Sequence, residues 1–310
     1  MDNKMNKLNG SRFANCEEIF SSEFEEINSE LLKLNVEHKL PDHSVLNKER
    51  FGWWREISSD TVYYGSRFWE YPFAIRSSEL NDGLKCADIG CGTTPFLVYL
   101  ANKVGSRNVT GFDPDLIQKS GDTRHSAFGI REKFIDHIGI NFSADSMTKL
   151  NAESESFDRV FCLSVLEHTP FETQIAGLKE MVRILKPGGK LILTMDLGIN
   201  LPLTFPLDLI KFSGLTPHLN VLDLKWPEKR FVRYEDGQSV DVFGLVLEKP
   251  VDQIYADHNA KRKIDYSEAN ARYLRLYDHL LVSYNEALFV KEYRMNPYKA
   301  ILKLLLKKYA

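Results

Sequence analysis

The segment of residues 87–100, ADIGCGTTPFLVYL, places two glycines one residue apart between a short apolar run and a stretch with helical spacing. The apolar run predicts a buried strand at 84–89, and the following stretch predicts a helix at 95–104 that begins with a proline. Backbone amides at such a junction point outward, and glycine lets a ligand approach the backbone closely. The segment therefore predicts a strand–turn–helix unit that binds a nucleotide-like molecule at Gly90, Cys91 and Gly92.

The alternation of strand and helix continues along the chain. We expect further strands at 108–112, 138–143, 158–163 and 190–195, with an amphipathic helix at 173–185. Repeated units of this kind predict an α/β fold with a doubly wound, parallel sheet and helices on both faces. Two later strand-like runs, near 231–234 and 240–248, predict an antiparallel edge and bring the expected sheet to seven strands.

An acidic residue follows the second expected strand. Asp113 lies 21 residues after Gly92, where a carboxylate can accept hydrogen bonds from both hydroxyls of a ribose. The dinucleotide fingerprint also needs a third glycine for close helix–strand packing, and the chain has Thr94-Pro95 there. The spacing favours a nucleotide-like ligand over the pyrophosphate of NAD.

Five blocks of sequence together resemble one family. They are ADIGCGT at 87–93, GFDP at 111–114, SADS at 143–146, the run from FDRVF to VLEH at 157–168, and LKPGGKL at 185–191. In this order they are similar to the motifs of class I S-adenosylmethionine-dependent methyltransferases of the small-molecule type (methyltransferase type 11-like). The resemblance covers about residues 80–196 and implies a Rossmann-like fold.

The resemblance implies S-adenosyl-L-methionine as cofactor and assigns residues to each of its parts. Asp88 would lie near the methionine amino group, with the backbone of Gly90, Cys91 and Gly92 along the methionine portion. Asp113, followed by Pro114, would bind the ribose hydroxyls. Asp145 and Ser146 would contact the adenine. Each carboxylate also has a structural alternative: Asp88 as a brace of its loop, Asp113 as a helix cap, and Asp145 as an exposed turn residue.

Other residues would complete the crevice above the strand ends. Ser164 follows the fourth expected strand and would flank the cofactor. His168 is the candidate general base for an acceptor hydroxyl, because its ordinary pKa is close to neutral; the alternative is that it holds the next loop. No metal is expected, since Ser164 stands where some quinone O-methyltransferases place a ligating glutamate. Arg67 and Tyr64 are expected to reach the cofactor's carboxylate; the alternative is an aromatic core with a surface arginine.

The expected organisation has three parts. Residues 1–79 form a helical and aromatic cap, with eight aromatic side chains between Trp53 and Phe73. Residues 80–250 form the methyltransferase domain, in which 197–226 is an apolar insert that walls the substrate pocket. Residues 251–310 form a helical extension that ends in a basic amphipathic stretch at 298–309. Such a stretch packs on its own core, on a second copy of the chain, or peripherally on a membrane surface.

Composition limits the classes of molecule that we expect the protein to bind. The net charge is −3 and the pI about 6.3, which gives no overall attraction to nucleic acid. We therefore expect a small-molecule acceptor and no nucleic-acid partner, and the sequence allows a homodimer. We expect no signal peptide, because the first residues show no apolar h-region, and no transmembrane span, because no apolar run in the sequence approaches the necessary length. The four cysteines show no zinc spacing, and Cys86 and Cys162 lie in expected buried strands, which favours a reducing, cytoplasmic location.

The chemistry expected is transfer of a methyl group to an oxygen or nitrogen atom of a metabolite, sugar or lipid-like acceptor. Two other function classes stay open. A catalytically inactive, cofactor-binding partner subunit would need damaged cofactor residues, whereas Asp88, Gly90, Gly92 and Asp113 are intact. An NAD-dependent oxidoreductase is disfavoured by Thr94-Pro95.

Overall fold

The computed structural model describes residues 10–38, 57–58, 61–63, 66–92, 94–114, 138–197, 205–218, 230–232 and 239–251. Tyr64 and the expected amphipathic stretch at 298–309 lie outside these residues. Within them, no helix has the length and apolar character needed to cross a membrane.

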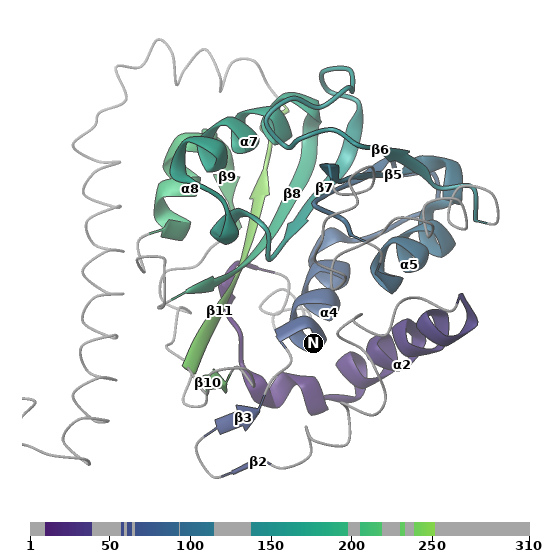
Figure 1. Ribbon diagram of the computed structural model, residues 1–310, viewed down its shortest axis with the longest axis vertical. Coiled ribbons are helices and arrows are strands. Elements are labelled where there is room, and N and C mark those ends of the chain that lie inside the picture. The colour runs from purple at the N-terminus through teal and green to yellow at the C-terminus, as the bar shows by residue number, and fades with distance from the viewer. Residues whose placement is uncertain are drawn as a thin grey trace, which may run out of the picture.

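A mostly parallel sheet forms the centre of the fold (Figure 1). Its parallel strands are β4 (Cys86–Ile89), β5 (Val109–Phe112), β6 (Asn141–Ser143), β7 (Phe157–Leu163) and β8 (Leu185–Leu197), and the antiparallel β11 (Ser239–Glu248) follows β8. The order in space is β6-β5-β4-β7-β8-β11. This confirms the doubly wound sheet with an antiparallel edge. Because the strand order reverses beside β4, a crevice is expected at the carboxyl ends of β4 and β7.

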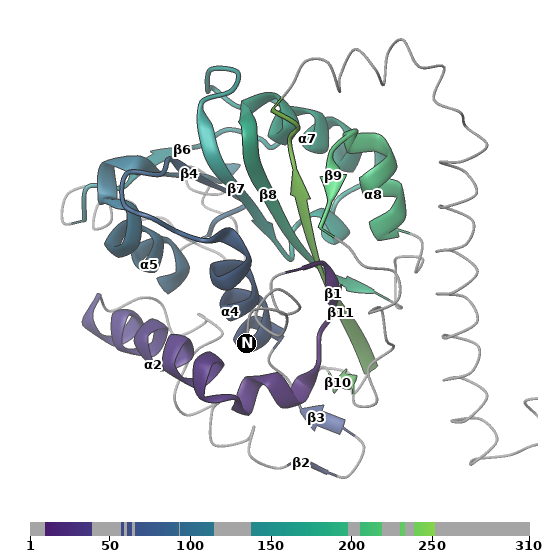
Figure 2. The same ribbon diagram turned by 180° about the vertical axis from the view of Figure 1, so that it is seen from behind.

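Among the residues that the structure describes, the sheet has eleven strands rather than the seven expected. The outer side of β11 is shared by three short strands that pair with it antiparallel: β10 (Arg230–Val232), β1 (Arg12–Phe13) and β9 (Thr216–Pro217). Beyond β10 lie β3 (Thr61–Tyr63) and β2 (Ile57–Ser58). Figure 2 shows β1 and β9 beside β11 from behind. The sequence predicted β10 as a run near 231–234, but it did not reveal β1, β2, β3 and β9, because strands of two or three residues are too short to produce a periodic pattern.

The strand β8 also begins earlier than expected. The segment Lys186-Pro187-Gly188-Gly189 was expected to separate helix from strand, but β8 runs through it from Leu185. Gly188 has a φ of 73°, and the pairing of β7 with β8 shifts register between Phe157 and Arg159. The segment therefore forms an irregular start of the strand.

Helices cover both faces of the sheet (Figure 1). On one face α2 (Ser22–Glu37), α4 (Ser66–Ser78) and α5 (Pro95–Val104) share a core with Phe161 and Ile192. On the other, α7 (Phe171–Ile184) and α8 (Phe205–Ser213) share a core with Val160 and Leu193. Neighbouring residues of β7 and β8 thus point to opposite cores, as the pleat requires. Three short 3₁₀ helices complete the described elements: η1 (Cys16–Phe20), η3 (Ser106–Asn108) and η6 (Leu166–His168).

The aromatic region near the N-terminus contributes α4, which packs directly on the sheet. Trp69 and Phe73 are fully buried and stack with ring centroids 4.6 Å apart. Gly244 of β11 lies under the Phe73 ring, and a Cβ atom there would collide with it. Within residues 197–226, which were expected to form an insert, the structure places α8 and β9, which the sequence did not predict. Cys86 and Cys162 are buried, as expected.

Candidate functional site

The turn after β4 holds both of its glycines in the left-handed region. φ is 72° at Gly90 and 52° at Gly92, where other residues are strained. The amides of Gly90 and Cys91 donate to the Phe112 carbonyl oxygen at 2.7 and 3.3 Å and tie the turn to β5. Among the described residues, a Cβ atom on Gly92 would come within 4 Å only of Thr94 Cγ2, at 4.0 Å. The turn is therefore fixed at its start and open above Gly92.

Two carboxyl groups stand at the ends of adjacent strands. Asp88, in β4, is 4% exposed, and Asp113 follows β5 and accepts from the Gly92 amide at 2.8 Å through Oδ2. Burial raises the pKa of Asp88 well above its ordinary value, Asp113 raises it further, and Arg67 lowers it. A cationic ligand group would lower the pKa of Asp88 again. The position beside Asp88 therefore favours the binding of such a group.

Arg67, in α4, reaches the end of β7. Its Nη1 pairs with Glu70 Oε2 at 2.9 Å and donates to the Leu163 carbonyl oxygen at 3.4 Å. The Ser164 hydroxyl donates to the other oxygen of Glu70, a side chain with no exposed surface. Burial opposes the charge of Arg67, yet nearby carboxylates, Glu70 first, raise its pKa above the ordinary value. A buried polar link therefore joins α4 to the strand end.

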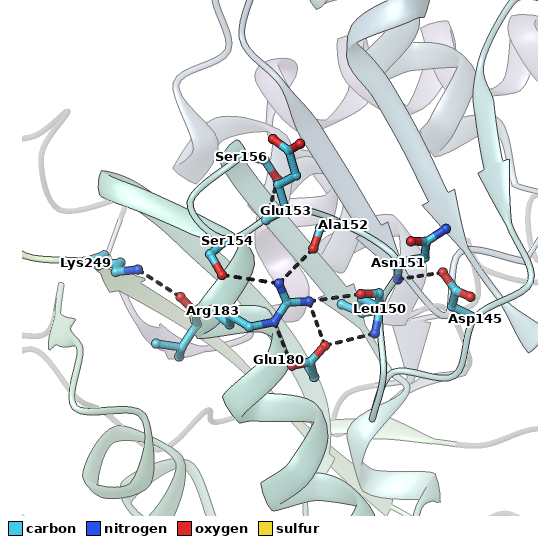
Figure 3. Close-up of polar contacts among 11 residues, drawn as sticks. Asp145, Leu150, Asn151, Ala152, Glu153, Ser154, Ser156, Glu180, Arg183 and Lys249 are labelled. Atoms are coloured by element: carbon cyan, nitrogen blue, oxygen red, sulfur yellow. Dashed lines mark hydrogen bonds and ion pairs between the residues drawn. The ribbon is translucent and has the colours of Figure 1, made fainter.

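The loop that carries Asp145 is held by its own contacts (Figure 3). Asp145 Oδ2 accepts from the Ser143 hydroxyl at 2.6 Å and from the Asn151 amide at 2.8 Å. Farther along, Arg183 of α7 donates to the carbonyl oxygens of Leu150 and Ala152 at 2.9 and 2.7 Å. The half-buried Asp145 carboxylate is thus used in the turn through one oxygen, and its contact with an adenine stays a prediction.

The pair Glu167-His168 lies in η6, directly after β7. His168 has a side chain 64% exposed, and its Nε2 lies 4.0 Å from Glu167 Oε1. Glu167 is turned inward: it is 9% exposed, and Oε1 accepts from the Asp196 amide at 3.1 Å. Burial raises the pKa of Glu167 to about 8, and Asp196 contributes to the rise. The inner member of the pair is therefore the glutamate, whereas the sequence argument chose the histidine.

Most of the expected site residues follow neighbouring strand ends. Those at β4, β5 and β7 are Asp88, Gly90, Cys91, Gly92, Asp113, Pro114 and Ser164, and Arg67 joins them from α4. Asp145 and Ser146 follow β6. The side chain of Cys91 is buried against Gly111, so this residue can offer a ligand only its backbone.

Sequence reasoning missed Glu70 and Asp196. Asp196 directly follows the expected strand at 190–195. Ligands of open α/β sheets bind at the carboxyl ends of the strands, so its position could have identified it as a site residue. Glu70 carries no such signal, because its partner Ser164 is 94 residues away.

Known proteins match the same part of the chain. The family described as "Methyltransferase domain" matches residues 87–193. The methyltransferase GfsG of Streptomyces halstedii is 28% identical over 160 residues, which are 44% of this chain and 51% of that one. The tRNA U34 carboxymethyltransferase of Campylobacter concisus (strain 13826) is 30% identical over 136 residues, 43% of this chain and 44% of that one. The ubiquinone biosynthesis O-methyltransferase of Xanthomonas oryzae pv. oryzae (strain PXO99A) is 32% identical over 115 residues, 36% of this chain and 43% of that one.

These matches span about half the length of each relative, and they coincide with the strands and turns at whose carboxyl ends a crevice is expected. The glycine turn, both acidic strand ends, β7, α7 and most of β8 lie within residues 87–193. We conclude that residues 87–193 of this chain form a methyltransferase domain of the class I S-adenosylmethionine-dependent type.

Proposed function

We propose that this protein transfers the methyl group of S-adenosyl-L-methionine to an oxygen or nitrogen atom of a small-molecule acceptor. The observation that carries the proposal is the glycine turn, open above Gly92, between the carboxyl groups of Asp88 and Asp113. When bound, the sulfonium supplies an activated methyl group, and the protein's task is alignment and exclusion of water.

The residues fit the separate parts of this cofactor. Asp113 is half-buried and accepts from Gly92 through Oδ2, and we assign the ribose hydroxyls to its carboxylate. The raised pKa of Asp88 suits a neighbouring ammonium group, since such a cation restores the charged carboxylate. Asp145, Ser146 and Pro114 are assigned to the side of the adenosine, and the backbone of Gly90 and Cys91 to the methionine portion.

The cofactor's carboxylate is assigned to Arg67, with Tyr64 as the second candidate. Arg67 uses Nη1 for Glu70 and Leu163. A guanidinium group carries further N–H donors in a planar fork, and such a fork suits a carboxylate. The contacts with Glu70 and Leu163 use only Nη1, which supports assigning the other N–H groups to the cofactor's carboxylate.

The acceptor class is the finer part of the proposal. The net charge of −3 and the absence of a basic stripe in the sequence favour a small molecule over nucleic acid. Three relatives are tRNA U34 carboxymethyltransferases, so unmodified tRNA belongs among the acceptors tested. A cytoplasmic location is proposed with this function, supported by the buried thiols of Cys86, Cys91 and Cys162.

Calorimetric titration tests the proposal first. We expect S-adenosylmethionine and S-adenosylhomocysteine to bind and NAD to give no heat. Absence of binding by both sulfur ligands to folded protein would refute the methyltransferase function, and binding of NAD would favour the oxidoreductase alternative. Incubation with methyl-labelled cofactor and a panel of alcohols, phenols, amines and tRNA then identifies the acceptor. Binding without transfer to any of them would favour the inactive partner subunit.

A further inference from the structure

The carboxyl ends of β7 and β8 bring Glu167 and Asp196 together. The two strands are parallel and pair at Leu163 and Thr194, so their ends meet at the same edge of the sheet. The Asp196 amide donates to Glu167 Oε1 at 3.1 Å, which fixes the orientation of the Glu167 carboxyl group. This edge is also where the glycine turn and Ser164 lie, so the group belongs to the crevice.

The second oxygen of Glu167 has no hydrogen-bond partner among the residues that the structure describes, although it is buried. The residue itself is more than nine-tenths buried. An unpaired buried polar atom costs roughly 1–3 kcal/mol, and native proteins keep few of them. An oxygen kept in this state beside a binding crevice points to a partner that arrives with a ligand.

The charged groups around Glu167 help to set the pKa of its carboxyl group, and so its strength as a proton acceptor. Asp196 of β8 and Glu70 of α4 face it with negative charge, and Arg67 of α4 faces it with positive charge. The buried Cys162 thiol lies on the strand behind it, and His168 lies on the outer side. Burial and the two acids raise the pKa of Glu167 to about 8, near the value at which a general base is effective at neutral pH.

We propose that Glu167 accepts the proton from the acceptor's nucleophile at Oε2, and that the acceptor is therefore an alcohol or a phenol. The inference rests on the proposed methyltransferase function and narrows its acceptor from oxygen or nitrogen to a hydroxyl group. As the bond from the hydroxyl oxygen to the methyl carbon forms, the bond from that carbon to sulfur breaks and the sulfur keeps the electron pair. The hydroxyl proton passes to Glu167 Oε2, and the products are a methyl ether, a neutral thioether and a protonated glutamate.

The exposed His168 has a separate role in the proposed proton transfer. Its Nε2 is 4.0 Å from Glu167 Oε1 and its ring is largely in water. A base in this position meets bulk solvent, whereas the acceptor is held in the crevice. We assign His168 to carrying the proton from Glu167 to water, and Glu167 to the acceptor itself.

A calorimetric experiment tests Glu167 without any acceptor. S-adenosylmethionine carries a sulfonium charge that S-adenosylhomocysteine lacks, and the two ligands share every other ionic group. If Glu167 lies beside the sulfur, the cation lowers its pKa, and the wild-type protein releases more protons with S-adenosylmethionine than with S-adenosylhomocysteine. Titrations at pH 7.5 are repeated in buffers of different ionisation enthalpy, because the dependence of the measured heat on the buffer gives the number of protons released. The expected difference in protons released between the two ligands is roughly 0.5 per site.

Glu167→Gln is the test variant, because the amide oxygen keeps the bond from Asp196. We expect both ligands to bind and the proton difference to disappear. Glu172→Gln, an exposed acid-to-amide change at the start of α7, is the matched control and should keep the difference. If Glu167→Gln does not fold, Asp196→Asn takes its place, and it should move the pH at which the difference is largest to a lower value.

The outcomes separate the two proposals. Failure of both ligands to bind the wild-type protein would overturn the methyltransferase function. Binding with no proton difference, or with a difference that survives in Glu167→Gln, would overturn only the assignment of Glu167. Once the acceptor is known, Glu167→Gln should lower kcat about 100-fold or more while KM for S-adenosylmethionine changes little. An amine acceptor that is methylated equally fast by this variant would also refute the proposal.

Discussion

The substitution Gly90→Ala tests whether the glycine turn is fixed by packing against the loop that carries Glu167. A Cβ atom at Gly90 would lie 2.6 and 2.7 Å from the two γ carbons of Val165, far inside van der Waals contact. Valine is stiff about χ1, and Val165 directly precedes η6, so the clash cannot be relieved by a rotamer change alone. We expect the substitution to displace η6 as well as the turn.

The free energy of unfolding that Gly90→Ala loses has two parts, which can be measured separately. Holding alanine at a φ of 72° costs about 1–2 kcal/mol, and overpacking against Val165 costs about 1–3 kcal/mol more. The expected loss in the free energy of unfolding is therefore about 2–5 kcal/mol. Val165→Ala alone removes two methyl groups from a half-buried site and should cost about 1 kcal/mol.

A double-mutant cycle measured by urea unfolding, with far-UV circular dichroism as the signal, isolates the clash. The double variant removes the γ carbons, so the backbone cost, the lost valine contacts and a milder contact with the Cβ atom of residue 165, at 3.2 Å, should remain. It should be about 1–3 kcal/mol more stable than the sum of the single changes predicts. Additivity within about 0.5 kcal/mol would refute the clash as the reason for glycine at this position.

Three further changes have outcomes that the described contacts determine. Asp113→Asn keeps an oxygen for the Gly92 amide but loses the charge, so calorimetry should show roughly 10–100-fold weaker binding of S-adenosylhomocysteine. Arg183→Met removes hydrogen bonds to the carbonyl oxygens of Leu150 and Ala152 and should lower the free energy of unfolding by about 1–3 kcal/mol, measured with urea. Glu167 makes the folded state hold a proton between the ordinary pKa of 4.5 and about 8. The free energy of unfolding should therefore fall as pH rises through this window, and Glu167→Gln should flatten the slope.

The changes at Asp113 and Arg183 each have a comparison variant, and the prediction for Glu167 is tested by comparing Glu167→Gln with the wild-type protein. Asp158→Asn alters a carboxylate at the opposite end of β7, paired with Lys186, and should leave affinity unchanged; equal losses in both variants would contradict the binding site at the carboxyl ends. Arg183→Lys keeps the charge but not the fork, so wild-type stability in that variant would rule out the carbonyl contacts as the stabilising feature. An unchanged pH slope in Glu167→Gln would contradict the raised pKa.

The sequence alone determined the parts of the fold that depend on near neighbours in the chain. The helix at Pro95–Val104 was predicted with its observed bounds, and β4, β5, β7 and α7 with ends within two residues. These elements have a strong period, a glycine turn or a proline at the helix start, all of which act within a few residues. The same local motifs named Asp88, Gly90, Gly92 and Asp113, which the fold then brings to adjacent strand ends.

Tertiary structure decided what depends on residues far apart in sequence. The strands β1 and β9 also pair with β11, and no pattern within two residues could specify that pairing. Glu70 meets Ser164 from 94 residues away, and Glu167 faces inward while His168 faces water because of how η6 packs. Burial sets the pKa of an acid through its whole surroundings, so the chemical difference between two neighbouring residues emerges only when the chain has folded.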